Sequence, residues 1–487
     1  MKTNVWLCLL ALLSTVAMAQ SPSGKSDTTP GFDISAMDTS VDPCTDFYTY
    51  ACGGWRARNP IPADRSGWGR FNELQERNNG ILRGLLEQAA AGKTGRSADE
   101  QKIGDYYGSC MDEKEVESRG AKPIQAELER IANLKSMSEL PTLLARLHQA
   151  GVNAVFRTES EQDFKDATQV IAVTDQGGLS LPDRDYYLKD DAKFAEIRQQ
   201  YVAHVQKMFE LLGETPQQAA SSARTVMAME TALAEVSLER VKRREPANIY
   251  HKMTLAELAA LSPSYSWAEY LKAAGVPPVD SLNVRVPDFV RGIEAQLKSR
   301  DLAEWKTYLR WKVLTASSIL LSAAFVDENF DFFGHKLTGA KENRPRWKRC
   351  VEYVDNDLGE ALGKLYVEKT FGAEGKARML QMVHALESAL GKDIQELPWM
   401  TEATKKQAMV KLHSIANKIG YPDEWRDYSR LVIARDDLVG NSTRSNAFEF
   451  QRQLEKIGKP VDTKEWLMTP PTVNAYYDPQ MNNINFP

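Results

Sequence analysis

The chain has 487 residues, 43% of them hydrophobic, which is enough for two or three domains with a sizeable core. Its 61 basic and 66 acidic residues leave a formal net charge of −5, so a strongly basic face for nucleic acid is not expected. Charged residues make up 26%, as in an ordinary globular protein.

Residues 1–19 carry the pattern of an export signal. Lys2 supplies a positive start, residues 5–13 form an apolar run, and Ala17-Met18-Ala19 has the small-x-small spacing of a signal peptidase site. The run is short for a span of ~30 Å of hydrocarbon, and no later stretch approaches about 20 apolar residues. We expect a signal peptide rather than an N-terminal anchor, a periplasmic or extracellular protein, and no membrane anchor after cleavage.

Export also changes the interpretation of the cysteines. Cys44, Cys52, Cys110 and Cys350 form an even set in an oxidising compartment, where disulfides persist. None belongs to a C-x-x-C pair, and none is flanked by a histidine at metal-binding spacing, which argues against a zinc knuckle. Residues 20–38, rich in Ser, Thr, Gly and Asp, are typical of a flexible leader.

Amphipathic helical patterns dominate the chain from residue 71 onwards. Ser97 and Glu100 form a capping box ahead of a helix whose apolar face contains Ile103, Tyr106 and Cys110. Further helices are predicted over residues 193–212, 218–243, 286–325 and 343–419.

Strand patterns are few. Residues 153–157 and 169–173 are short and rich in β-branched side chains, and they could pair with each other. Residues 473–486 look extended. The fold class is therefore predicted as mainly α: a large helical domain over residues 39–425 with a small β element, followed over residues 426–487 by the incomplete start of an α/β unit.

The last three residues lie within an apolar, strand-like segment. Because the exposed edge of such a strand needs a partner, we interpret the ending as a truncation. The alternative is an apolar tail that happens to fray.

The sequence contains no recognisable catalytic pattern. No two of the six histidines lie three to five residues apart, so no helix carries the ligand pair of H-E-x-x-H. No G-x-S-x-G elbow, G-x-G-x-x-G or phosphate loop occurs. We therefore predict no catalytic residue and no metal ligand in this chain. Taken alone, these absences favour a binding or scaffold protein over an enzyme.

A series of short motifs nevertheless resembles the neprilysin and endothelin-converting-enzyme family of zinc metalloendopeptidases. The motifs follow the family's order across roughly residues 40–487: residues 42–55 (DPCTDFYTYACGGW), Ile61-Pro62, Trp68-Gly69, Phe71, residues 178–187 (GLSLPDRDYY), 345–350 (PRWKRC), 363–367 (GKLYV), Trp399-Met400, Thr404-Lys405, 418–422 (KIGYP), 473–477 (VNAYY), Asn483 and 485–487 (NFP).

The resemblance implies a large helical domain that caps a thermolysin-like zinc domain around a chamber for peptides. It places the zinc motif beyond the equivalent of Pro487, so zinc would belong to the full-length parent, with none bound by this chain. Residues 426–487 would begin the catalytic domain, whose missing C-terminal part and peptide substrates would be the partners. Asn474 and Ala475 would bind the substrate main chain by β-augmentation; the alternative is an ordinary strand start.

The resemblance also implies a Cys110–Cys350 disulfide and free thiols at Cys44 and Cys52, whose family counterparts pair with the C-terminal half. Gly67 stands where some animal members have a carboxylate-binding arginine. Arg65 and Arg70 are the nearby candidates for that role, against ordinary surface positions for both.

Two functions from different classes follow. The first is the N-terminal part of a secreted zinc metalloendopeptidase that hydrolyses peptides, inactive on its own because it lacks the zinc motif. The second is a naturally shortened, non-catalytic peptide-binding protein; a helical structural module without a ligand is a weaker third reading.

Overall fold

The structure is a computed structural model and describes residues 33–92 and 94–487. The predicted signal peptide at residues 1–19 and most of the predicted leader lie outside the described residues. The described residues divide into two compact units, the first ending at residue 60 and the second beginning at residue 61.

The described part of the first unit contains a 3-10 turn, η1 (Ile34–Ala36), and one helix, α1 (Phe47–Arg58). Asp46 caps α1 by accepting a hydrogen bond from the Thr49 N–H at 3.0 Å. Gly54 lets the 35–37 backbone approach, because a Cβ there would lie 2.5 Å from the Met37 carbonyl. Cys44 and Cys52 both carry free thiols.

The second unit is mainly helical, as predicted. Its helices are α2 (Arg70–Ala90), α3 (Ala98–Met111), α4 (Glu113–Arg119), α5 (Lys122–Ala132), α6 (Leu140–Gln149), α7 (Asp185–Leu188), α8 (Ala192–Leu211), α9 (Pro216–Glu235), α10 (Leu255–Leu261), α11 (Trp267–Ala274), α12 (Pro287–Ser299), α13 (Leu302–Ser317), α14 (Ala323–Asn329), α15 (Arg346–Thr370), α16 (Gly372–Glu396), α17 (Glu402–His413) and α18 (Leu438–Leu454). Short 3-10 and π segments add η2 (Met137–Glu139), η3 (Lys242–Arg244), η4 (Pro246–Asn248), η5 (Ser318–Leu320) and η6 (Phe330–Lys336).

Two small sheets interrupt the helices. The first has the order β1-β2-β4-β3 and contains β1 (Phe156–Gln162), β2 (Val170–Gln176), β3 (Lys252–Thr254) and β4 (Ser281–Val284). The second has the order β5-β7-β6 and contains β5 (Ala416–Ile419), β6 (Tyr476–Asp478) and β7 (Asn483–Phe486).

The predicted pairing of the two early strands is confirmed. β1 and β2 are antiparallel, with Phe156 opposite Gln176 and Gln162 opposite Val170. β1 begins three residues later than predicted because Val155 has a positive φ of 61° and gives its N–H to the Tyr308 hydroxyl at 2.9 Å. An extended ladder cannot continue through that conformation.

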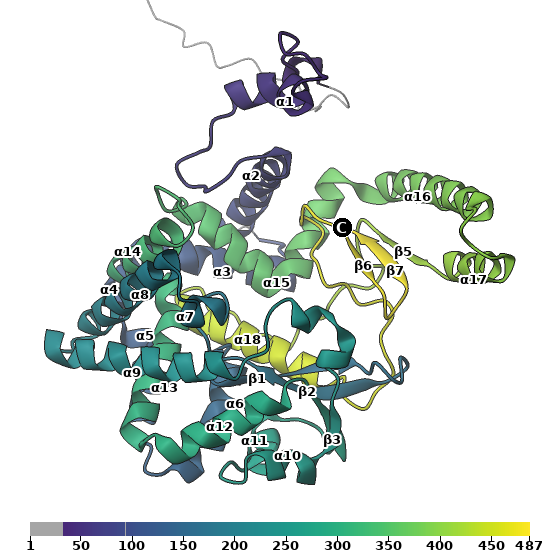
Figure 1. The fold of residues 1–487 in the computed structure, drawn as a ribbon. Coiled ribbons are helices and arrows are strands. Elements are labelled where there is room, and N and C mark those ends of the chain that lie inside the picture. Colours follow the sequence, from purple (N-terminus) through teal and green to yellow (C-terminus); the bar gives the residue numbers. More distant parts are fainter. Residues whose placement is uncertain (1–32, 93) are drawn as a thin grey trace, which may run out of the picture. The chain divides into compact units, whose positions relative to one another are not determined.

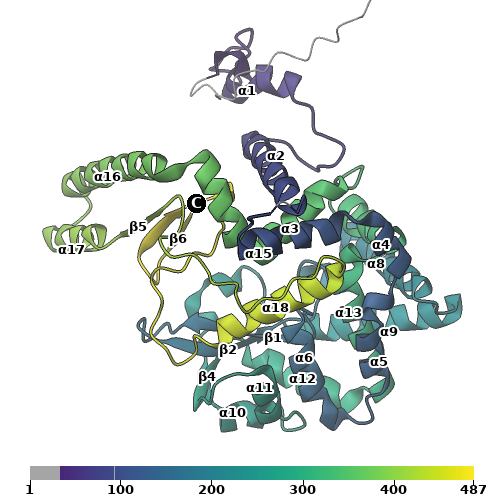
Figure 2. The ribbon, with the colours of Figure 1, turned by 180° about the vertical axis from the view of Figure 1, so that it is seen from behind.

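The prediction of helix through Ile419 is wrong at its end. Residues 416–419 form β5, which pairs in parallel with β7, so that Ala416 lies opposite Asn483. Figures 1 and 2 show α16 and α17 as a helical hairpin that leads into this strand. The pairing partner is more than 60 residues away, where local periodicity carries no information about it.

One hydrophobic core runs through the second unit. It contains α3, α8, α9, α13 and the first half of α15, with Tyr201, Phe209 and Trp311 fully buried. α18 also contributes, through Leu438, Val439 and Leu454. Figures 1 and 2 show this helix lying along β1, and it contacts α6, β1 and α15. The predicted domain boundary between residues 425 and 426 stays a prediction.

The 178–187 motif is built into this core. Glu230 of α9 is fully buried and accepts hydrogen bonds from the hydroxyls of Ser180, Tyr187 and Tyr201 at 2.6–2.7 Å. Lys312 lies 3.6 Å from Glu230 and donates to Ser180 at 2.9 Å. A buried charge is costly unless it is paired and hydrogen-bonded. The polar residues of the motif therefore serve to stabilise the buried Glu230 carboxylate.

Among the described residues, no single helix is both long and apolar enough to cross a bilayer. The segments Leu302–Leu320 and Ala323–Lys336 reach that length and composition only as a pair bent by 105°.

Candidate functional site

The two predicted substrate-binding residues lie at the open edge of the second sheet. Asn474 and Ala475 are exposed and directly precede β6. β6 pairs with β7 on one side, with Tyr476 opposite Asn485, and on its other side it has no strand partner within the described chain. The Asn474 side-chain oxygen accepts a hydrogen bond from the Ala475 N–H at 2.8 Å. This backbone edge can therefore accept a further strand.

A cavity of about 610 Å³ adjoins the same residues. Its walls come from α2, the C-terminal part of α15 and the segment 470–475. Most of the lining is apolar or aromatic, and among the described residues that form it Arg77 is the only one with a charged side chain. The lining residues are Phe71, Leu74, Arg77, Asn78, Ile81, Tyr366, Val367, Thr370, Phe371, Gly420, Pro470, Thr472, Val473, Asn474, Ala475 and Pro487. Phe71 and Leu74, which are 69% and 44% exposed, extend the apolar lining to the surface.

The segment before Asn474 is held by hydrogen bonds to both neighbouring helices. Asn78 of α2 donates to the Pro471 carbonyl at 2.8 Å, and the Tyr366 hydroxyl of α15 donates to the Asn78 side-chain oxygen at 3.0 Å. The three residues form a chain from α15 through α2 to the site. The backbone that leads to Asn474 is therefore positioned by the side chain of Asn78, a residue 393 positions earlier than Pro471 in the sequence.

Close packing against α15 fixes the same segment. A Cβ at Gly359 would lie 2.2 Å from Thr469 Cγ2, and a Cβ at Gly363 would lie 2.7 Å from Pro470 Cδ. Real Cβ atoms do not approach so closely, so both positions require glycine. Gly363 belongs to the 363–367 motif, which gives that motif a physical role: it makes room for the chain that leads to Asn474.

Three other polar residues of the terminal motifs, Tyr476, Asn483 and Asn485, form hydrogen bonds within the protein. Asn483 and Asn485 are buried, and the Asn485 amide donates to the Asn483 side-chain oxygen at 2.6 Å. The Tyr476 hydroxyl accepts from the Leu467 N–H at 3.1 Å. These residues hold β6 and β7 in place, whereas Asn474 and Ala475 remain accessible.

Two half-buried acidic residues of α15, Asp355 and Asp357, have raised pKa values. Asp355 accepts a hydrogen bond from Thr469 at 3.2 Å, and its second oxygen is buried without a partner in the described chain. Burial raises the pKa of Asp355 to about 7, against the opposing effect of the Thr469 hydrogen bond. Burial likewise raises the pKa of Asp357 to about 6, although the Tyr106 hydroxyl donates to it. Neither residue stands out in the sequence, because acidic residues in a helix are usually solvated.

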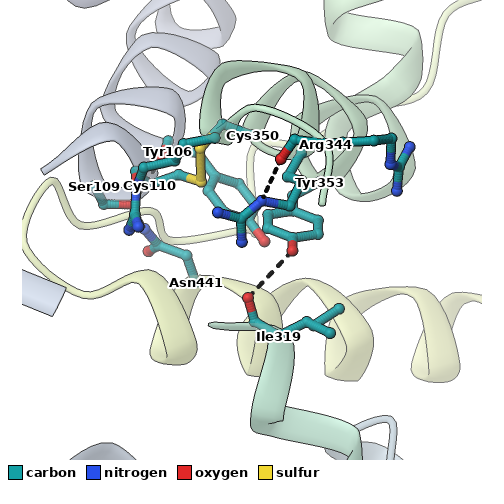
Figure 3. The surroundings of a disulfide bond; sticks show 10 residues. Tyr106, Ser109, Cys110, Ile319, Arg344, Cys350, Tyr353 and Asn441 are labelled. Atoms are coloured by element: carbon teal, nitrogen blue, oxygen red, sulfur yellow. Dashed lines mark hydrogen bonds between the residues drawn. A yellow bond between two sulfur atoms is a disulfide. The ribbon is translucent and has the colours of Figure 1, made fainter. Parts of the chain in front are cut away.

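The other end of α15 is tied to the core by a disulfide. Cys110 of α3 and Cys350 of α15 are bonded, with a Cα–Cα distance of 5.7 Å, as the family resemblance implied. Figure 3 shows this bond and, beside it, the Tyr353 hydroxyl donating to the Ile319 carbonyl at 3.2 Å. α15 thus connects the disulfide, the two acidic residues with raised pKa values and the cavity wall.

The two candidate arginines do not line the cavity. Arg65 forms an ion pair with Glu76 at 2.5 Å, and Lys348 binds the same carboxylate at 2.8 Å. Arg70 pairs with Glu73 at 2.8 Å. Both guanidinium groups are thereby occupied by α2, and a role in binding a free carboxylate stays a prediction without support from these contacts.

The described residues do not form a zinc site. They contain no group of three or more His, Cys, Asp or Glu side chains placed to hold a metal ion. His148 is buried between the Tyr270 hydroxyl and the Ala154 carbonyl, and burial lowers its pKa to about 4. His204 pairs with Glu328 at 2.9 Å.

Known proteins share both the sequence pattern and the fold. The family model described as peptidase family M13 matches residues 43–422. Human endothelin-converting enzyme 1 is 32% identical over 477 residues, and neprilysin-3 of Drosophila melanogaster is 30% identical over 482 residues. Each alignment covers 93% of this chain and 61% of the relative, so the chain spans about three fifths of the length of these curated relatives.

Solved structures agree. The zinc metalloprotease ZMP1 of Mycobacterium tuberculosis, in complex with an inhibitor, matches with a TM-score of 0.89 and 39% identity, over 94% of this chain and 69% of that one. The PepO structure from Lactobacillus rhamnosis is similar in fold, with a TM-score of 0.80 at 22% identity over 89% of this chain and 69% of that one. The chain belongs to peptidase family M13, the family of neprilysin and the endothelin-converting enzymes.

Proposed function

We propose that this chain supplies the helical cap and the substrate-binding strand of an exported zinc metalloendopeptidase that cleaves oligopeptides. Family membership supports the reaction class, and the pattern of residues 1–19 supports export to the periplasm or the extracellular space. The sequence has no H-E-x-x-H motif, so the zinc ligands would come from the further segment that the family resemblance implies.

The observation that carries the proposal is the open edge of β6 beside an apolar cavity. A peptide in extended conformation adds to this edge as a fourth strand. The Asn474 amide and the Ala475 backbone then bond to its main chain, and one of its apolar side chains enters the cavity between α2 and α15. Main-chain pairing provides affinity with few demands on sequence, as a peptidase of broad range requires.

The alternative, a peptide-binding protein without catalysis, predicts the same binding but no hydrolysis. A fluorogenic peptide assay on the protein expressed from the complete coding sequence separates the two. We expect cleavage that a zinc chelator abolishes and added zinc restores. Peptide binding without cleavage, in a preparation that contains stoichiometric zinc by elemental analysis, would favour the binding protein.

The binding mode is tested on the present chain with a labelled apolar peptide and fluorescence anisotropy. Asn474→Ala should weaken binding about 5- to 10-fold, the effect of one lost hydrogen bond of about 1 kcal/mol. Asn133→Ala is the matched control, since Asn133 is an exposed residue at the end of α5, away from the cavity lining. A peptide N-methylated on its backbone should bind more weakly than its parent; equal binding of the two peptides would rule out strand addition.

A further inference from the structure

A second cavity, of about 320 Å³, lies where the first sheet meets the loop after α9. It shares no lining residue with the cavity beside β6. Its walls come from the ends of β1 and β2, the turn 177–184 and residues 237–243. Four arginines and one acidic residue, Asp183, are in this lining; the arginines are Arg157, Arg184, Arg240 and Arg243.

Only one of these four guanidinium groups is neutralised at hydrogen-bond distance. Arg243 binds both oxygens of the buried Asp175, at 2.8 and 2.6 Å. Arg157 lies 3.8 Å from the same carboxylate, and Arg184 lies 3.6 Å from Glu239. Arg240 has no ion-pair partner in residues 33–92 and 94–487. The cavity therefore holds an excess of positive charge in a protein whose net charge is −5.

Two of the less neutralised arginines are held by the backbone. Arg157 Nε donates to the Gln176 carbonyl at 3.3 Å, and Arg184 Nε donates to the Ala234 carbonyl at 3.2 Å. These bonds engage one edge of each guanidinium and leave terminal N–H groups available. A planar guanidinium presents paired donors that match a carboxylate or phosphate, and an arginine already held in place loses less rotamer entropy when it binds one.

The apolar part of the lining decides between classes of anion. Leu179, Leu181, Pro182 and Leu238 lie among the arginines. An inorganic oxyanion makes no favourable contact with such side chains, whereas a glutamate presents two methylene groups beneath its carboxylate. The volume also falls at the lower end of the range for organic ligands, about 300 to 1,000 Å³.

We propose that this cavity binds an acidic peptide segment through the carboxylates of its side chains, with Arg157, Arg184 and Arg240 as the recognition residues. Arg243, fixed by Asp175, forms the positively charged wall behind them. The inference concerns a second site and does not depend on strand addition at β6.

The test uses the full chain and a fluorescent, N-acetylated peptide with three consecutive glutamates, compared with the same peptide carrying glutamines. Fluorescence anisotropy at low ionic strength should show the glutamate peptide binding at least 10-fold more tightly. The double variant Arg157→Gln/Arg240→Gln should reduce that affinity at least 10-fold. Both side chains are exposed, so the fold should survive, and thermal unfolding of the variant verifies this.

Arg244→Gln is the matched control, because Arg244 is exposed, lies next to Arg243 in η3 and is absent from the cavity lining. It should change the affinity less than 2-fold. Equal losses in the control and the double variant would mean general electrostatic attraction and overturn the proposal, as would equal binding of the two peptides. Displacement of the glutamate peptide by an equal concentration of inorganic phosphate would overturn the peptide assignment and make this an oxyanion site.

Discussion

An acidic residue of the first sheet and one next to the segment that leads into the second sheet have pKa values shifted in opposite directions. In the first sheet, Asp175 of β2 is fully buried and bound by Arg243 and Arg285. Burial alone would raise its pKa, but these two cations outweigh burial and hold the pKa below its ordinary value. In α15, Asp355 contacts Thr469 of the segment that leads into the second sheet; one of its oxygens is buried without a hydrogen-bond partner in the described chain, and its pKa rises to about 7.

The two sheets also differ in the charge at one edge. β3 ends the first sheet with Lys252, which binds the buried Asp163 at 2.7 Å and so carries a charge at that edge. β6 is an edge strand of the second sheet, and the exposed residues Asn474 and Ala475 directly precede it, beside an apolar cavity. The β3 edge therefore carries a charge that is already paired, whereas the β6 edge lies open beside the apolar cavity.

The largest expected effect comes from breaking the charge cluster of the first sheet. Asp175→Asn leaves Arg243 without a carboxylate within hydrogen-bond distance, and the free energy of unfolding should fall by about 3 to 5 kcal/mol. Urea unfolding at pH 7 measures it. Asp436→Asn, whose side chain is 79% exposed, should change stability by less than about 0.5 kcal/mol. If Asp175→Asn lowered the free energy of unfolding by less than about 1 kcal/mol, the charge pairing in the first sheet would not be a major source of stability.

The second prediction uses the opposite pKa shifts. Because the pKa of Asp355 is raised by folding, the folded state binds more protons between about pH 4 and pH 7, and the contribution of this group to stability is lost as pH rises through 7. Asp355→Asn should therefore raise the free energy of unfolding at pH 8 by about 2 to 4 kcal/mol and change it little at pH 4.5. For Asp175 the sign is reversed. Its lowered pKa stabilises the folded state at pH values above the pKa that the group has in the unfolded chain, and this stabilisation is lost as the pH falls.

Chemical unfolding at the two pH values measures this difference. Asp393→Asn, an exposed position on α16, serves as the control and should show the same small effect at both. If Asp355→Asn were neutral at pH 8 as well, the carboxylate would be solvated rather than buried.

The smallest expected effect on stability concerns the packing behind the β6 entrance. Gly363→Ala places a Cβ 2.7 Å from Pro470 and should cost about 1 to 3 kcal/mol. It should also weaken peptide binding, because Pro470 belongs to the segment that positions Asn474. Gly84→Ala in α2 has nothing within 4 Å of the new Cβ and should stabilise by about 0.5 to 1 kcal/mol. Thermal unfolding and peptide-binding anisotropy of both variants check these two expectations. A change in stability of the same sign in both variants would contradict them.

The helical elements were largely predictable from local sequence. The capping box of Ser97 and Glu100 is present at the start of α3, with Ile103, Tyr106 and Cys110 buried, as predicted. Such features depend on residues within one or two turns of each other, so periodicity and caps are enough to find them. The order of family motifs likewise pointed to Asn474 and Ala475; both residues are exposed, and their role in substrate binding stays a prediction.

Tertiary structure alone decided which charges are compensated. Asp175 and Asp355 are both acidic residues in regular elements, yet one meets Arg243 and Arg285 from distant segments and the other meets Thr469. Residues 416–419 became a strand only because β7 lies beside them. The arginines of the second cavity come from β1, the turn before α7 and the loop after α9. Local sequence determines which elements can form; dielectric, charge pairing and strand partners depend on residues brought together by the fold.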